Sequence, residues 1–261
     1  TYEEANTIHN DVDIIINTTP VGMYPKNDGQ IIDLDNFKNV IGVIDVVYNP
    51  LRTNLVLQAK TQNLIAEGGL YMLVGQAVYA AGIFLNKEID LNIIDEIYEK
   101  IKNDKENIVL IGMPSSGKST IGKILSEQLN KKLIDTDELI VNKLNMSIAE
   151  YMKTHSEKEF RDIETECVKE AAKMSNVVVA TGGGAILRTE NVNALKQNGK
   201  LYFLKRNLEL LTPTESRPFS SDMEALKKRY TERLPIYESV CDVVIDNNNE
   251  ISDAVKQILG E

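Results

Sequence analysis

The sequence predicts an α/β fold with a parallel sheet in each of two parts. Short runs rich in β-branched residues alternate with longer amphipathic stretches along the 261 residues, which is the order of parallel strands joined by helices. A charged segment, Tyr98–Asn107, interrupts this alternation and is interpreted as a helix end that runs into a linker. We therefore expect one domain over residues 1–103 and a second over residues 104–261.

The first part is expected to be a partial Rossmann-like α/β segment. Its predicted strands are Asp13–Asn17, Val40–Asp45 and Leu64–Ala66, and its predicted helices are Asn54–Gln62, Met72–Asn86 and Leu91–Ile101. The two longer strands are mostly apolar, as buried strands of a parallel sheet are, and no glycine-rich loop opens this part. The apolar stretch Leu70–Leu85 is shorter than the roughly 20 residues of a membrane-spanning helix, so a helix buried on most sides is expected there.

The second part alternates strands and helices more regularly, which predicts a central parallel sheet covered on both faces. Its predicted strands are Ile108–Ile111, Leu133–Asp135, Val177–Ala180, Leu201–Leu204 and Val243–Ile245, and its predicted helices include Ser119–Leu129 and Glu157–Met174. Ser147 and Glu150 have the spacing of a capping box at the start of another helix. Thr189 is expected to cap a helix that ends at Gly199, and Pro235 is expected to kink or end a later one.

Composition limits the classes of function that the chain can have. Hydrophobic residues make up 43% and charged residues 26%, which is typical of a soluble globular protein. The net charge of −10 argues against a nucleic-acid partner, and no membrane partner or signal peptide is indicated. Cys167 and Cys241 lack metal-binding or redox spacing, which indicates inert thiols in a reducing cytoplasm. Because the chain starts at Thr1, within a domain pattern, we expect a fragment or a processed chain.

The strongest motif is a glycine-rich loop of the kind that binds phosphates. Gly112–Ser119 reads GMPSSGKS, which matches G-x-x-x-x-G-K-[ST] between a predicted strand and a predicted helix. Glycines let the backbone wrap around phosphates, and the loop amides and the helix N-terminus face the negative oxygens. Lys118 would reach the β- and γ-phosphates, and the Ser119 hydroxyl would bind Mg²⁺. A bland Gly/Ser turn is the alternative, and the flanking strand and helix favour nucleotide binding.

Two acids follow the next predicted strand. Leu133–Asp137 reads LIDTD, and the carboxyl ends of parallel strands border the ligand crevice of an open sheet. Asp135 would then point at the Mg²⁺ region, and Asp137 could face an acceptor hydroxyl. Spacing alone equally allows these acids merely to cap the following helix, and Asp137 could do both.

Three glycines and three arginines complete the candidate site. Gly182–Gly184 follow the predicted strand Val177–Ala180, and glycines in this place mark a close approach of the backbone to a ligand. Arg161 borders the apolar stripe of a predicted helix, Arg217 lies in a Ser-, Thr- and Pro-rich segment expected to form a lid, and Arg233 begins RLPIY. Taken singly, such arginines are usually surface cations and such glycines a flexible loop.

Over about residues 107–261 the sequence resembles the shikimate kinase family. The matching segments are GMPSSGKST, DTDELI, EKEFRDIE, TGGGA, SRPF and RLPIYE, in the family's order and near its spacing. The resemblance implies a P-loop kinase domain in which Asp137 and the Gly182–Gly184 backbone bind shikimate. It also implies that Arg161 and Arg233 bind the carboxylate of shikimate, for which their planar forks are suited. Asp137 would orient or deprotonate the attacking hydroxyl.

The same resemblance implies an ATP site with Mg²⁺. The implied ATP-binding residues are Gly112, Pro114, Ser115, Ser116, Gly117, Lys118, Ser119, Thr120 and Arg217. Lys118, Asp137 and Arg217 are the implied catalytic residues, and Ser119 and Asp135 the implied Mg²⁺ ligands. The phosphoryl group would pass to shikimate, a step of aromatic amino-acid biosynthesis, mostly by positioning and charge neutralisation.

The lid and the adenine side of this site depart from the family's pattern. The lid segment, TPTESRPFSSD, is short of basic residues apart from Arg217. Leu210 stands where many relatives carry an arginine against the adenine, and residues 246–249 resemble the loop near the adenine. The resemblance therefore does not determine the nucleotide affinity or the base preference of this site.

Residues 1–102 resemble the C-terminal part of the shikimate dehydrogenase family. The matching segments are DIIINTTPVGM, DVVYNPLRT and EGGLYMLVGQA. The resemblance implies that Gln76 and Tyr48 lie at shikimate and Gly69 near the nicotinamide of NADP. Taken singly, Gln76 would be a satisfied polar group in a buried helix and Tyr48 a core aromatic residue.

That family's catalytic Lys–Asp pair and glycine-rich NADP loop have no counterpart in this segment. We therefore expect no dehydrogenase activity from it alone, NADP binding only if a complete dehydrogenase domain is supplied, and exposed apolar surface. Its partner would be the missing dehydrogenase portion or a second copy of the chain.

Two other functions stay open from the residues alone. Another small P-loop kinase, of the gluconate or nucleoside type, would share the phosphate-binding loop. A nucleoside kinase would need an aromatic clamp for the base, and the chain has no Trp. A non-catalytic nucleotide-binding module would bind ATP without turnover, so that Asp137→Asn would change nothing measurable.

Overall fold

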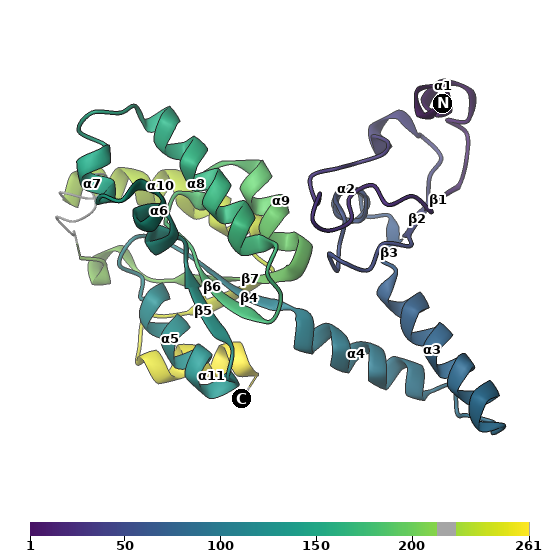
Figure 1. Ribbon diagram of the computed structural model, residues 1–261. Coiled ribbons are helices and arrows are strands. Elements are labelled where there is room, and N and C mark those ends of the chain that lie inside the picture. Colours follow the sequence, from purple (N-terminus) through teal and green to yellow (C-terminus); the bar gives the residue numbers. More distant parts are fainter. Residues whose placement is uncertain (213–222, 261) are drawn as a thin grey trace. The chain divides into compact units, whose positions relative to one another are not determined.

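The computed structural model describes residues 1–212 and 223–260 (Figure 1). Contacts divide the described chain into two compact units. The first comprises Thr1–Glu106 with Lys196–Asn198, and the second comprises the remaining described residues from Asn107 onward. In the described part of the chain, no helix is both long and apolar enough to cross a membrane.

The first unit contains a three-stranded parallel sheet in the order β1-β2-β3. Its elements are α1 (Tyr2–Ile8), β1 (Ile14–Asn17), the 3-10 helix η1 (Leu34–Asn36), β2 (Gly42–Asp45), α2 (Asn54–Thr61), β3 (Ile65–Glu67), α3 (Leu70–Leu85) and α4 (Ile93–Lys105). Helix α2 packs on the sheet, with Leu55 and Ala59 against Val43. A separate cluster joins α3 to α4, with Val74 near Ile94. The predicted strands and helices of this part are present, with shifted ends.

Helix α3 is far less buried than the sequence predicts, so that prediction is wrong. Tyr79, Ile83 and Phe84 are 58%, 78% and 86% exposed. The reason is that α3 packs through a single stripe, which includes Leu70 and Val74, against α4. The exposed apolar surface expected for this part is therefore present on α3.

The predicted linker at Tyr98–Asn107 is also wrong. Helix α4 continues to Lys105, and β4 begins at Asn107. Lys102 pairs with Glu99 at 3.1 Å, one turn away on the same helix. The predicted helix end is present at Lys105, but lysine and glutamate are good helix formers and the helix continues too far to leave a linker before β4.

The second unit contains a five-stranded parallel sheet in the order β5-β6-β4-β7-β8. Its strands are β4 (Asn107–Ile111), β5 (Lys132–Asp135), β6 (Val177–Ala180), β7 (Gly199–Lys205) and β8 (Val243–Asp246). Its helices are α5 (Lys118–Leu129), α6 (Thr136–Leu144), α7 (Ile148–Tyr151), α8 (Glu157–Ala172), α9 (Thr189–Asn198), α10 (Met223–Val240) and α11 (Ile251–Leu259), with 3-10 helices η2 (Ala185–Leu187) and η3 (Leu208–Leu210).

Helices cover both faces of this sheet, as the sequence predicts (Figure 1). On β4, Leu110 packs in a cluster with residues of α5 and α11. Its neighbours Val109 and Ile111 belong to the opposite cluster, which includes residues of α8, α9 and α10. Alternate residues of β4 therefore pack into the hydrophobic cores on opposite faces of the sheet. Because the strands are parallel, their carboxyl ends lie along one edge of the sheet.

Two local predictions in this unit need correction. Thr189 is the first helical residue of α9, and Arg188 precedes it with the extended backbone that an N-cap position requires. Pro235 lies inside α10 and does not end it. Proline removes a single backbone hydrogen bond, and Arg233 and Tyr237 on either side both donate to the Gly183 carbonyl, so tertiary contacts carry the helix through. Of the capping box predicted at Ser147, one half is present, since the Ser147 hydroxyl accepts the Glu150 N–H.

Candidate active site

The loop Gly112–Ser119 connects β4 to α5, which is the context that the motif requires. Gly117 has φ +86° and Gly112 φ +153°, and both values favour glycine. A Cβ atom on Gly112 would also lie 2.9 Å from Ser116 Oγ and 3.0 Å from the Leu204 carbonyl oxygen. The loop therefore depends on these two glycines for its shape.

Lys118 lies folded into this loop and is only 5% exposed. Its ammonium donates to the carbonyl oxygens of Gly112 at 2.9 Å and Met113 at 2.8 Å. The buried amide of Asn247 donates from Nδ2 to the Ser116 carbonyl at 2.6 Å. Lys118 thus holds the loop from inside, and Asn247, which directly follows β8, holds it from outside.

The two predicted metal ligands contact each other at the carboxyl end of β5. Ser119 Oγ donates to Asp135 Oδ2 at 2.7 Å, and Asp135 Oδ1 accepts the Asp137 N–H at 2.9 Å. Asp135 therefore caps α6, while Asp137 lies in its first turn. Hydroxyl and carboxylate oxygens suit Mg²⁺, which binds proteins through one or two such groups besides phosphates and water. Among the described residues, no cluster of three or more His, Cys, Asp or Glu side chains could hold a metal ion.

The three glycines after β6 touch three different parts of the site. A Cβ atom on Gly182 would lie 2.6 Å from Asp137 Oδ1, and one on Gly183 would lie 2.8 Å from Pro114 Cδ. A Cβ atom on Gly184 would collide with the Arg161 guanidinium. The structure therefore brings Asp137, Arg161, the phosphate loop and these glycines together, as expected for one site.

Arg161 is buried, and Glu164 one turn later on α8 holds it in place. Arg161 Nη1 donates to Glu164 Oε2 at 2.7 Å, and Nη2 donates to Glu157 Oε1 at 3.2 Å. Burial raises the pKa of the Glu164 carboxyl, and the Arg161 guanidinium opposes that rise. Sequence reasoning missed Glu164, although its position three residues after a candidate arginine on a helix was a usable signal.

Arg233 reaches the same glycine loop from α10. Its Nη1 donates to the Gly183 carbonyl at 3.0 Å, and the side chain is buried. Leu210, at the end of η3, is exposed. Arg217 and the lid segment after Thr212 lie outside the described residues.

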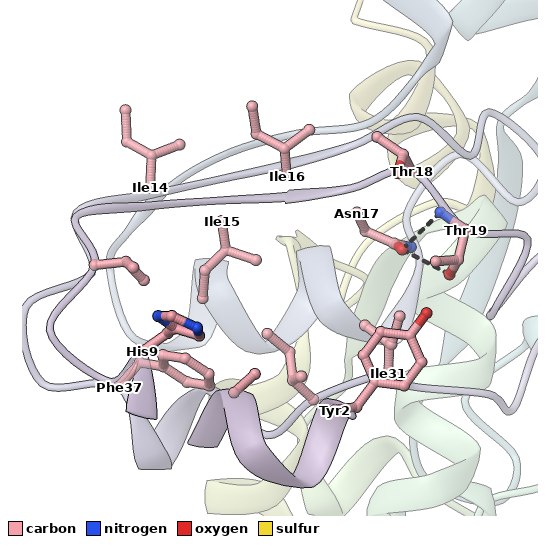
Figure 2. A pocket seen from close by; sticks show the side chains of 13 residues that line it. Tyr2, His9, Ile14, Ile15, Ile16, Asn17, Thr18, Thr19, Ile31 and Phe37 are labelled. Atoms are coloured by element: carbon pink, nitrogen blue, oxygen red, sulfur yellow. Dashed lines mark hydrogen bonds between the residues drawn. The ribbon is translucent and has the colours of Figure 1, made fainter. Parts of the chain in front are cut away.

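The first unit has a cavity of about 370 Å³ beside β1 (Figure 2). Ile15 points into the space between the strand and α1, whereas Ile14 and Ile16 point to the other face. At its polar end, Asn17 Oδ1 accepts the Thr19 N–H at 3.0 Å and the Thr19 hydroxyl at 2.7 Å. Most of its other walls are apolar, with Ile15, Ile31 and Phe37 among the lining residues.

The dehydrogenase-like residues lie elsewhere in this unit. Tyr48 and Gln76 are exposed, so the interpretations of a core aromatic residue and of a buried polar group are both wrong. Gly69 precedes α3, and a Cβ atom there would collide with the Val46 carbonyl oxygen. Local packing therefore requires glycine at this position.

Comparison with known proteins gives the second unit its family. The family model for shikimate kinase matches residues 114–261. A shikimate kinase of Caldicellulosiruptor bescii is 38% identical over 150 residues, which cover 55% of this chain and 87% of that protein. The structure of shikimate kinase from Acinetobacter baumannii in complex with shikimate is 31% identical, with a TM-score of 0.58, and covers 61% of this chain and 94% of that one.

A further similarity involves shikimate dehydrogenase 1 from Peptoclostridium difficile, at 38% identity and a TM-score of 0.35, over 38% of this chain and 36% of that one. The match to shikimate kinases covers more than half of this chain and most of the length of each relative named above. Together with the phosphate loop and the residues gathered around Gly182–Gly184, it shows that this chain belongs to the shikimate kinase family.

Proposed function

We propose that the second unit transfers the γ-phosphoryl group of ATP to a hydroxyl group of shikimate. One observation supports it above the others: Gly182–Gly184 contact Asp137 and Arg161 on one side and Pro114 of the phosphate loop on the other. A phosphoryl donor and a small acidic acceptor would therefore be held next to each other.

The acceptor would be bound by charge and by hydrogen bonds. Arg161 and Arg233, both buried beside the glycine loop, would take the carboxylate of shikimate through their planar guanidinium groups. Asp137 would accept a ring hydroxyl and orient or deprotonate it for attack. Gly182–Gly184 would allow the ring to approach the backbone closely.

The donor would be bound by the phosphate loop. Lys118 would exchange the carbonyls of Gly112 and Met113 for β- and γ-phosphate oxygens, and residues 114–120 would supply further donors. Ser119 and Asp135 would hold Mg²⁺, which neutralises phosphate charge when bound. Arg217 would close with the lid onto the phosphates and exclude water.

A coupled ADP-release assay tests this function, with shikimate, gluconate and nucleosides offered as separate acceptors. We expect turnover that depends on shikimate and on Mg²⁺, with little on the other two acceptors. Equal turnover on gluconate would favour the alternative metabolite kinase, and ATP binding without any acceptor-dependent turnover would favour a non-catalytic module.

We also propose that residues 1–103 form a separate domain and a remnant of shikimate dehydrogenase, inactive alone. The three dehydrogenase-like segments and the parallel order of β1, β2 and β3 support this. No NADP-dependent oxidation of shikimate is expected from the chain, and measurable turnover would contradict the proposal. The exposed apolar residues of α3 would be covered by the rest of a dehydrogenase or by a second copy, which light scattering at increasing concentration distinguishes.

Both cysteines are free thiols, which fits a place for this reaction in the reducing cytoplasm.

A further inference from the structure

Two side chains of α10 meet at one carbonyl group of the glycine loop. Arg233 and Tyr237 are four residues apart and so lie on the same face of the helix. Tyr237 Oη donates to the Gly183 carbonyl oxygen at 2.6 Å, and Arg233 Nη1 donates to the same oxygen at 3.0 Å. A carbonyl oxygen has two lone pairs, so these two donors satisfy it fully.

The Tyr237 hydroxyl is built into the interior. The side chain is 0% exposed, and its ring stacks on Phe203 with centroids 4.9 Å apart and planes at 8°. Burial raises the pKa of the Tyr237 hydroxyl well above its usual range, so it stays protonated and remains a donor. The phenol is therefore a fixed, permanent donor to Gly183.

This hydrogen bond determines which way the Gly183 peptide faces. The Gly183 carbonyl oxygen is held by two donors of α10, while the neighbouring Gly182 and Gly184 pack against Asp137 and Arg161. Gly183 also lies against Pro114, since a Cβ atom on it would come within 2.8 Å of Pro114 Cδ. Rotation of this peptide would therefore move Arg233's partner on the acceptor side and a residue that packs on the phosphate loop.

We propose that Tyr237 is a positioning residue for acceptor binding: its hydroxyl fixes the Gly183 carbonyl and thereby the guanidinium of Arg233. This inference rests on the proposed kinase function. Tyr237 itself touches neither substrate, and it acts through Arg233 and the glycine loop.

The test is steady-state kinetics of Tyr237→Phe, which removes one oxygen atom and keeps the ring stacked on Phe203. We expect the KM for shikimate to rise about tenfold, the magnitude of one lost buried hydrogen bond, with kcat and the KM for ATP within about twofold. Tyr151→Phe, a change at another buried phenol of the same unit, is the matched control and should leave all three constants unchanged.

A double-mutant cycle with Arg233→Lys separates positioning from general stability. If Tyr237 acts through Arg233, the two changes are not additive, and Tyr237→Phe raises the shikimate KM less than about threefold in the Arg233→Lys background. Full additivity, or an unchanged shikimate KM in Tyr237→Phe, overturns the inference.

Thermal unfolding of each variant shows whether a change in KM comes from partial unfolding. A lower midpoint with an unchanged shikimate KM would assign Tyr237 a structural role only and would also overturn the inference. A wild-type chain without shikimate-dependent ADP release would instead overturn the proposed function.

Discussion

Both parallel sheets of this protein are built from short apolar strands, but the strands differ in how far they are buried. In the second unit, every residue of β6 is buried, because helices cover both faces. In the first unit, Ile14 and Ile16 of β1 are 56% and 57% exposed, although Ile15 between them packs toward the core. An apolar run thus predicts a strand well but does not predict how many of its faces are covered. The candidate active-site residues lie in the unit whose sheet is covered on both faces, in loops at the ends of its strands.

The largest expected effect is on the chemistry of the second unit. Asp137→Asn should lower kcat by about 10²–10⁴-fold, because the amide cannot accept a proton from the acceptor hydroxyl. ATP binding, measured by calorimetry, should stay nearly intact. Gln76→Ala, at a polar residue of the first unit, is the control and should leave kinase activity unchanged. Equal rates for wild type and Asp137→Asn would remove the main distinction between the two units.

A pair of glycine substitutions compares the two units directly. Gly184→Ala places a methyl group against the Arg161 guanidinium and should destabilise the protein by about 1–3 kcal/mol while raising the KM for shikimate. Gly75→Ala lies in α3, where a Cβ atom meets nothing within 4 Å, and should stabilise the helix by about 0.5–1 kcal/mol. Urea unfolding and kinetics of both variants check this, and a silent Gly184→Ala would show that the glycine loop is not closely packed.

Truncations on the two sheets sharpen the contrast in burial. Val179→Ala removes two methyl groups from a residue of β6 that is 0% exposed and should cost about 1–3 kcal/mol of unfolding free energy. Ile16→Ala removes more carbon from an exposed face of β1 and should cost within about 0.5 kcal/mol. Chemical denaturation measures both values. A large cost for Ile16→Ala would mean that its face is covered in solution, by a second copy or another protein.

A further comparison concerns the support of the phosphate loop. Asn247→Ala removes the donor to the Ser116 carbonyl and should raise the KM for ATP about threefold to tenfold. The KM for shikimate should change less than twofold, which is the reverse of the pattern expected for Tyr237→Phe. Changes of equal size in both constants would point to a general loss of structure.

Much of the active site could be predicted because it depends on local rules. The phosphate loop needs glycines at particular dihedral angles, and Gly112 and Gly117 have them. The residues around Gly182–Gly184 lie in short segments whose order resembles one family. Tyr237 and Asn247 were missed as individual residues because each acts through a contact that only the folded chain creates. Glu164 was missed although its spacing from Arg161 within one helix was visible.

Burial in the first unit could not be predicted for a related reason. Exposure of α3 depends on which elements pack on it, and an apolar sequence is compatible with one covered stripe or with several. Likewise, the charges before Asn107 indicated a linker, whereas ion pairing within α4 extends the helix. Tertiary contacts decided the exposure of α3, and local interactions within one helix decided the length of α4.

The carboxylate of Asp135 has a consequence for how this protein can vary. One of its oxygens accepts from Ser119 at the start of α5, and the other accepts from the backbone of Asp137 at the start of α6. Under the roles proposed above, Mg²⁺ binding by Asp135 and the orientation of Asp137 would therefore be linked through a single side chain. Variants at this position should change the two properties together, so that selection on one of them constrains the other.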